Sequence, residues 1–157
     1  MATLKVTAEP KSQNVHMVVT LDAPLEKVFQ YYTEKDLVKQ WWGQGEEVEV
    51  DYFVPGAGGK WRFIQRKNGF EAAFHGCFHA LEDNKMAIQT FEFEGLPETG
   101  HVALERADFV AVSDNRTEVR ITSTFQSVED RDGMIASGME GGFRQSIEAL
   151  GALIEQK

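Results

Sequence analysis

Histidine and cysteine alternate in one segment of the sequence, and both residue types can bind a transition metal. His75, Cys77 and His79 stand two residues apart, and zinc accepts imidazole and thiolate ligands. On a strand, however, side chains two residues apart are separated by about 6.6 Å, too far for three ligands at about 2.0–2.3 Å from one ion. The opposite face carries Phe74 and Phe78. We therefore predict that the histidines point outward and that no zinc or iron binds tightly.

Two other clusters look like binding sites but have simpler structural explanations. The charged run Glu129–Asp132 follows Ser127, and a Ser-x-x-Asp pattern begins a helix whose dipole favours acidic side chains. The run Gly56–Gly59 lacks the Lys-Ser/Thr ending and the strand-to-helix setting of a phosphate-binding loop. We interpret the first run as the start of a helix and the second as a turn.

The elements that position these residues belong to one domain. The chain has 157 residues, 42% of them hydrophobic, which suits a single core. We assign residues 1–157 to this domain and residues 1–12 to an N-terminal extension. The chain has 16 basic and 25 acidic residues and a formal charge of −9. An acidic surface repels phosphate backbones, so nucleic acid is not expected as a partner.

Cysteine usage and hydropathy bear on the compartment. Cys77 is the single cysteine of the sequence, which excludes an intrachain disulfide and a multi-cysteine zinc cage. No stretch approaches about 18 consecutive apolar residues, the length that crosses a membrane. The N-terminus lacks the basic and apolar blocks of a secretory signal. These observations predict a soluble, cytoplasmic protein without a membrane span.

The periodicity of apolar residues predicts an α+β fold. Asp22 is the expected N-cap of the first of two short helices before residue 43. Asn68-Gly69 is a strong hairpin pattern. Strands are predicted at residues 15–21, 47–53, 60–67, 70–81, 86–93, 101–112 and 117–126.

The last segment reads as one long helix beginning at Ser127. Its apolar side chains recur every three or four residues, which predicts one face packed on the sheet; they are Ile135, Met139, Phe143, Ile147, Leu150 and Ile154. Three glycines interrupt it, Gly138, Gly141 and Gly142. Because glycine destabilises a helix interior, they predict a kink or a close approach of the backbone to another group.

Six stretches of the sequence match a known family, in order. They are Asp22-Ala23-Pro24 with Val28-Phe29, Leu37–Gly43 ending in Trp-Trp-Gly, Gly58–Arg62, Gly76, Thr90–Gly95 and Ser127–Gly142. On these residues the chain resembles the SRPBCC (START-like, helix-grip) superfamily. Within it, the chain resembles the bacterial homologues of the heat-shock-chaperone ATPase activator, the polyketide cyclase-like branch. Gln44 departs from the family pattern, which usually has proline after Trp-Trp-Gly.

The resemblance implies a helix-grip fold. A curved antiparallel sheet of about six or seven strands would surround a long C-terminal helix, with two short helices after the first strand. It also implies a cavity between the sheet and that helix, and no cofactor. The side chains expected to line the cavity are Trp41, Trp42, Trp61, Phe63, Phe91, Phe93, Met139, Gly142 and Phe143.

Three functions are compatible with this resemblance, because the superfamily hosts several activities. The first is a soluble protein that binds a small apolar or amphipathic molecule in the cavity. The second is a cyclase or lyase in the same cavity, with Gln65, Gln89, Arg106 and Asp108 as candidate polar residues. The third is a chaperone-interacting domain of the stress response. A homodimer is left open.

Overall fold

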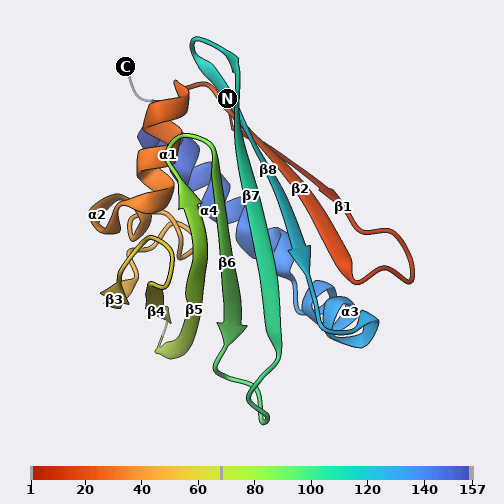
Figure 1. Ribbon diagram of the computed structural model, residues 1–157. Coiled ribbons are helices and arrows are strands. Elements are labelled where there is room, and N and C mark those ends of the chain that lie inside the picture. Colours follow the sequence, from red (N-terminus) through yellow and green to blue (C-terminus); the bar gives the residue numbers. More distant parts are fainter. Residues whose placement is uncertain (1, 68, 156–157) are drawn as a thin grey trace.

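The structure, a computed structural model, describes residues 2–67 and 69–155. Its strands are β1 (Thr3–Thr7), β2 (Asn14–Leu21), β3 (Glu49–Phe53), β4 (Lys60–Lys67), β5 (Phe70–Glu82), β6 (Met86–Phe93), β7 (Val102–Ser113) and β8 (Arg116–Thr124). Its helices are α1 (Leu25–Thr33), α2 (Lys35–Val38), α3 (Val128–Ala136) and α4 (Met139–Ile154). The described strands form one antiparallel sheet in the order β1-β2-β8-β7-β6-β5-β4-β3. α4 runs across one face of this sheet, from α1 towards α3 (Figure 1).

The α+β helix-grip fold is confirmed, with eight strands rather than six or seven. The additional strand is β1, which lies in the segment 1–12 that the sequence assigned to an N-terminal extension. It pairs with β2 so that Leu4 stands opposite Val19, and both side chains are buried. Burial of Leu4 gives this segment a place in the core.

The predicted hairpin at Asn68-Gly69 joins β4 and β5. Lys67 stands opposite Phe70 across the two strands. Gly69 has a φ of +77°, a conformation that glycine adopts at little cost. Asn68 lies outside the described residues.

The core lies between the sheet and α4. In β2 the alternating side chains of Val15, Val19 and Leu21 are fully buried, as the period of two predicts. From α4, Leu150 and Ile154 are buried against this face. The C-terminal half of the predicted apolar stripe is therefore core.

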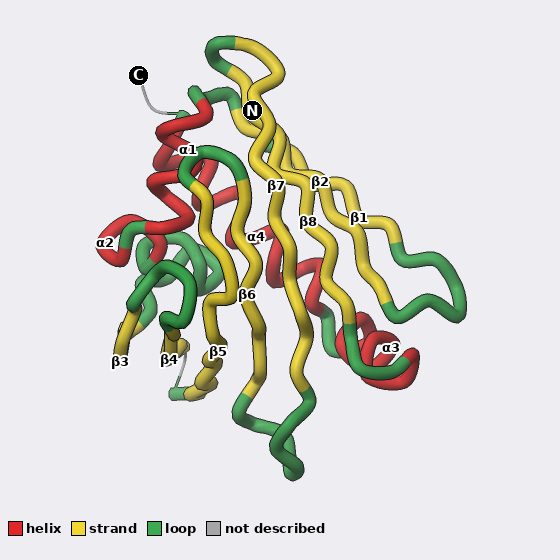
Figure 2. The backbone as a smooth tube through the Cα atoms, viewed as in Figure 1, coloured by secondary structure: helices red, strands yellow, loops and turns green. Residues whose placement is uncertain are grey.

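The C-terminal segment is two helices, and the prediction of one long helix is wrong. The first helix ends at Ala136, and Gly138 takes a left-handed φ of +89° that cannot continue a helix. Figure 2 shows the break as a loop between α3 and α4. Because of this break, the apolar side chains of α3 are not aligned with the buried face of α4. Ile135 is 38% exposed instead of facing the sheet.

Polar side chains hold α3 in place. The Ser127 hydroxyl accepts a hydrogen bond from the Asp130 amide at 3.0 Å, as the Ser-x-x-Asp pattern predicts. The buried Arg131 guanidinium donates to the carbonyls of Glu9 and Asn14, at 2.6 and 3.1 Å, and to Asp132. Arg131 thereby ties α3 to the loop between β1 and β2.

The predicted N-cap of α1 is wrong. Pro24 occupies that position, and no side chain caps the helix there. The Asp22 carboxylate instead accepts a hydrogen bond from Arg116 at 3.0 Å, which joins the start of α1 to β8.

A candidate ligand-binding cavity

A cavity of about 900 Å³ lies between the sheet and the helices. Strands β2 to β8 provide one side, and α3 and α4 provide another. The segment from α1 to the turn after α2 closes one end, and the β6–β7 loop lies at the other. All nine residues that the sequence analysis placed at a cavity lie along this one: Trp41, Trp42, Trp61, Phe63, Phe91, Phe93, Met139, Gly142 and Phe143.

Trp42 is the centre of an aromatic wall. Its ring packs against Trp61, Phe63 and Phe74, with centroid distances of 5.7, 5.1 and 5.1 Å. All three contacts are edge-to-face, the geometry that the aromatic quadrupole favours. Trp41, by contrast, is 2% exposed and donates its indole N–H to the carbonyl of Tyr31 at 2.9 Å. Both tryptophans border the cavity, but Trp41 is buried and hydrogen-bonded, whereas Trp42 is only partly buried.

Gly142 brings α4 close to the turn after Trp42. A Cβ atom at this position would stand 2.6 Å from the side-chain amide nitrogen (Nε2) of Gln44, so the predicted close approach is to Gln44. The buried Ser146 hydroxyl accepts from the Gln44 backbone amide at 3.0 Å and donates to the Trp42 carbonyl at 2.9 Å. Gln44 has a φ of +62°, which proline cannot adopt, so this turn differs from one that carries the family's proline.

A row of polar side chains crosses the otherwise apolar face of the sheet. Gln89 of β6 stands opposite Glu105 of β7, which stands opposite Ser123 of β8. The Ser123 hydroxyl donates to the Glu105 carboxyl at 3.1 Å. Burial raises the pKa of Glu105 to about 7, against the opposing effect of that hydrogen bond. The cavity therefore contains a carboxyl group that changes charge near neutral pH.

A buried phenol lies near this row. Tyr32, from α1, packs edge-on against Phe109 of β7 at a centroid distance of 5.3 Å. Burial raises its pKa, and the negative charge of Glu105 raises it further. Within the described part of the chain its hydroxyl has no hydrogen-bond partner. It is therefore a neutral donor available to a molecule in the cavity.

The cavity opens near the β6–β7 loop and the junction of α3 and α4, where the lining residues Leu96, Glu98 and Gly138 are exposed. His101, which directly precedes β7, bridges this opening. Its imidazole contacts Asp130 of α3 at 3.0 Å and Glu98 at 3.4 Å. The hydrogen bond with Asp130 raises the pKa of His101 and favours its charged form.

The four polar residues proposed for an enzyme divide into two pairs. Gln65 and Gln89 line the cavity, and Gln65 donates to the carbonyl of Gly43 at 3.3 Å. Arg106 and Asp108 lie on the opposite face of β7, where they form an ion pair at 3.1 Å. Because strand side chains alternate, Glu105 and Ala107 point into the cavity while Arg106 and Asp108 do not. The second pair is therefore not part of this site.

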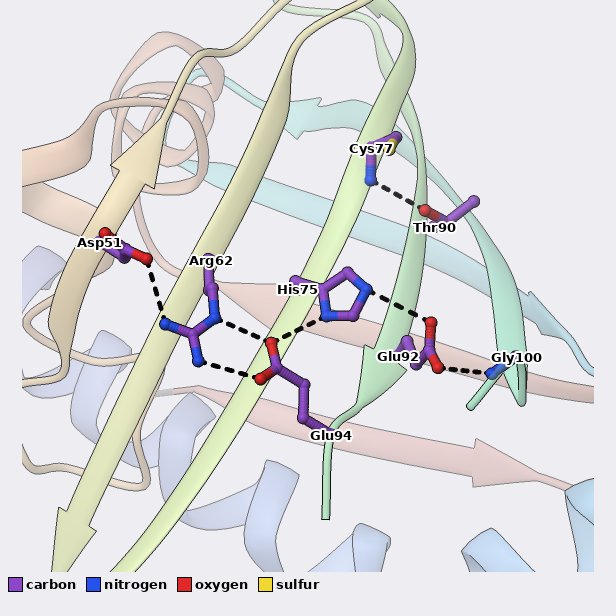
Figure 3. Close-up of polar contacts among 8 residues, drawn as sticks. All are labelled: Asp51, Arg62, His75, Cys77, Thr90, Glu92, Glu94 and Gly100. Carbon is purple, nitrogen blue, oxygen red and sulfur yellow. Dashed lines mark hydrogen bonds and ion pairs between the residues drawn. The ribbon is translucent and has the colours of Figure 1, made fainter. Parts of the chain in front are cut away.

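The His-x-Cys-x-His segment lies on the outer face, as predicted. Cys77 and His79 are exposed, and His75 contacts Glu94 and Glu92 at 2.9 and 3.3 Å (Figure 3). Arg62 donates two hydrogen bonds to Glu94 and lowers the pKa of that carboxyl to about 2. Among the described residues, no group of three histidine, cysteine or acidic side chains is arranged to hold a metal ion.

Sequence reasoning missed Glu105 and the role of Tyr32. Glu105 shares its strand parity with Ala103, Ala107 and Phe109, which all face the core or the cavity. A single carboxyl on the apolar parity of a strand is unusual, because burying an ionised group is costly. The position of Glu105 among apolar residues of the same strand face is the sequence feature that could have identified it.

No helix among the described residues is long and apolar enough to span a bilayer. No curated protein matches the chain. Solved structures do. A protein from Arthrobacter aurescens superposes with a TM-score of 0.87 at 23% identity, over 98% of this chain and 92% of that chain.

Two further structures support the same fold. A protein from Mycobacterium smegmatis matches with a TM-score of 0.85 at 18% identity, over 98% of this chain and 97% of that chain. DynU16, from the dynemicin biosynthetic locus, matches at 0.71 and 16% identity, over 92% of this chain and 48% of its own. Identities this low establish a shared fold only.

A match to a protein-family model shows which family the sequence is related to. The model is described as Activator of Hsp90 ATPase homolog 1-like protein, and it matches residues 22–155. The match begins directly after β2 and runs through the end of α4, so it includes every element that lines the cavity except β2. The chain therefore belongs to the Activator of Hsp90 ATPase homolog 1-like family.

Proposed function

We propose that the protein binds a small apolar or amphipathic molecule in the cavity between the sheet and α4. The observation that carries this proposal is a volume of about 900 Å³ walled mainly by apolar side chains, many of them aromatic, with polar groups in the minority. Small-molecule sites typically measure about 300–1,000 Å³ and combine apolar walls with a few oriented polar groups. We expect this binding to take place in the cytoplasm, where a lone exposed thiol such as Cys77 stays reduced.

An enzyme of the cyclase or lyase type is the second candidate, and Glu105 is the observation that favours it. A carboxyl whose pKa lies near 7 can accept and return a proton at neutral pH. The neutral Tyr32 hydroxyl could donate a hydrogen bond to a substrate carbonyl. This candidate uses the same cavity and differs in requiring turnover of the bound molecule.

Gly142→Leu should weaken binding of the neutral dye Nile red by more than about tenfold. The new side chain would displace the Gln44 amide and extend into the cavity, whose wall includes Gly142. Nile red fluoresces in apolar surroundings, so a fluorescence titration measures its dissociation constant. We expect about one equivalent to bind the unmodified protein.

Gly141→Leu is the matched control. Gly141 lies in the same helix, so the gain in helix propensity is equal, but a Cβ atom there meets nothing within 4 Å. This variant should bind the dye as the unmodified protein does. If the unmodified protein leaves the dye dark, the interior is a filled core. If both variants bind equally well, the dye binds outside the cavity. A surface-mediated role, such as contact with a chaperone, would then take precedence.

A further inference from the structure

We propose that the molecule bound in this cavity is a hydrophobic cation, an apolar body that carries one ammonium or similar basic nitrogen. This inference rests on the proposed function and specifies its ligand class. It draws on three features of the cavity: the sign of the charged side chains along its wall, the position of Glu105, and the aromatic rings beside that carboxyl.

The charged side chains of the cavity wall are predominantly acidic. Glu98, Glu105, Glu129 and Asp130 line it, and no lysine or arginine does among the described residues. His101 is the one basic side chain on this wall, and Asp130 and Glu98 already pair with it. A fatty acid or another anion would therefore meet like charge at the entrance and find no free cationic partner inside.

Glu105 lies well inside the cavity. His101 lies at the entrance, and Glu105 follows it by four residues of extended chain, which span about 13 Å. The Glu105 carboxyl accepts one hydrogen bond, from Ser123, and no cationic side chain pairs with it within the described residues. A buried carboxylate is stabilised when a charge of opposite sign pairs with it. A ligand ammonium group at this depth would supply that charge.

Aromatic rings stand beside this carboxyl. Phe91 pairs with Ala103, and Gln89 pairs with Glu105. Phe91 and Glu105 are therefore diagonal neighbours, with backbone positions about 7–8 Å apart. Its ring packs against Phe74 at a centroid distance of 5.6 Å and against Trp61 at 6.1 Å. Aromatic faces attract ammonium groups, most strongly where water is excluded. A carboxylate beside such faces suits a hydrophobic cation better than a neutral or anionic molecule.

The test compares three probes of one shape and different charge. They are phenylbutyl trimethylammonium, its neutral isostere in which tert-butyl replaces trimethylammonium, and a phenylalkanoate of the same length. Quenching or enhancement of tryptophan fluorescence reports binding, because Trp42 and Trp61 line the cavity. We expect the cation to bind at least about tenfold more tightly than the neutral isostere, and the anion to bind most weakly.

Two variants separate the role of Glu105 from that of overall charge. Glu105→Gln keeps the side-chain volume and should abolish the preference for the cation while leaving binding of the neutral isostere intact. Glu118→Gln removes one charge from the outer face of β8, where Glu118 pairs with Arg120 at 2.9 Å, and should retain the preference.

The outcomes distinguish this proposal from the function on which it rests. Equal binding of cation and neutral isostere by the unmodified protein would overturn the cationic ligand and leave the binding cavity standing. A preference that survives Glu105→Gln would likewise contradict the role of Glu105. Failure of all three probes to bind would overturn both the ligand class and the proposed function.

Discussion

Replacing Trp41 by alanine is expected to lower the free energy of unfolding by about 3–5 kcal/mol. The side chain is 2% exposed, and its ring packs on Tyr32 at a centroid distance of 4.9 Å. The substitution removes this packing and leaves the carbonyl of Tyr31 without its indole donor. Denaturant unfolding, followed by circular dichroism, measures the loss.

Trp42→Ala is the matched comparison, because it removes the same side chain one residue later. Both tryptophans border the cavity, but Trp42 is only partly buried, so we expect a loss of about 2 kcal/mol or less. Its main effect should be on ligand binding, since its ring contacts Trp61, Phe63 and Phe74 in the cavity wall. An equal loss of stability in both variants would show that the cavity is packed in solution.

Glu105→Gln is expected to stabilise the protein at pH 8 by about 3 kcal/mol. The pKa of Glu105 rises from its ordinary value of 4.5 to about 7 on folding, so the folded state binds the proton more tightly than the unfolded chain. Its contribution to stability is complete below about pH 4.5, falls as the pH rises to about 7, and stays low above that. Glutamine stays neutral throughout and avoids the loss.

The measurement is the difference in unfolding free energy between the two proteins at pH 4.5, 6 and 8. The other titratable groups along the cavity are Tyr32, Glu98, His101, Glu129 and Asp130. They are present in both proteins, so their titrations cancel to first order in the difference. A difference that does not change with pH would mean that Glu105 is solvated and ionised in the folded state, contrary to its position. Glu118→Gln, on the outer face of β8, is the control for the change in net charge.

Periodicity predicted most of the architecture, because a half-buried strand and a sheet-packed helix each leave a clear apolar pattern. Val15, Val19 and Leu21 in β2 and Ile147 and Leu150 in α4 are buried as their spacing predicts. The pattern could not show the break in the last helix, because Met139 keeps the spacing of three or four residues across Gly138. The left-handed conformation of Gly138 interrupts the helix without disturbing that order.

The large side chains of the cavity were predicted, but of its polar side chains Gln65 and Gln89 were predicted and Glu105 was missed. Aromatic residues on a strand face can be assigned to the interior from their type alone, as with Trp61 and Phe63. Glu105 and Arg106 are both charged neighbours on one strand, and only the facing of β7 decides which enters the cavity. That facing depends on the pairing of β7 with β6 and β8, contacts between residues distant in the sequence.

The junction between α3 and α4 has a consequence for local unfolding. Arg131 is the one buried residue of α3, whereas five residues of α4 are buried. A helix that is held mainly by hydrogen bonds and ion pairs, with little apolar surface against the core, unfolds locally at a lower free energy than the whole domain. Backbone amides of α3 should therefore exchange with deuterium faster than those in the second half of α4. Since Gly133, Met134 and Ser137 line the cavity, such an opening would widen the entrance while the sheet stays folded.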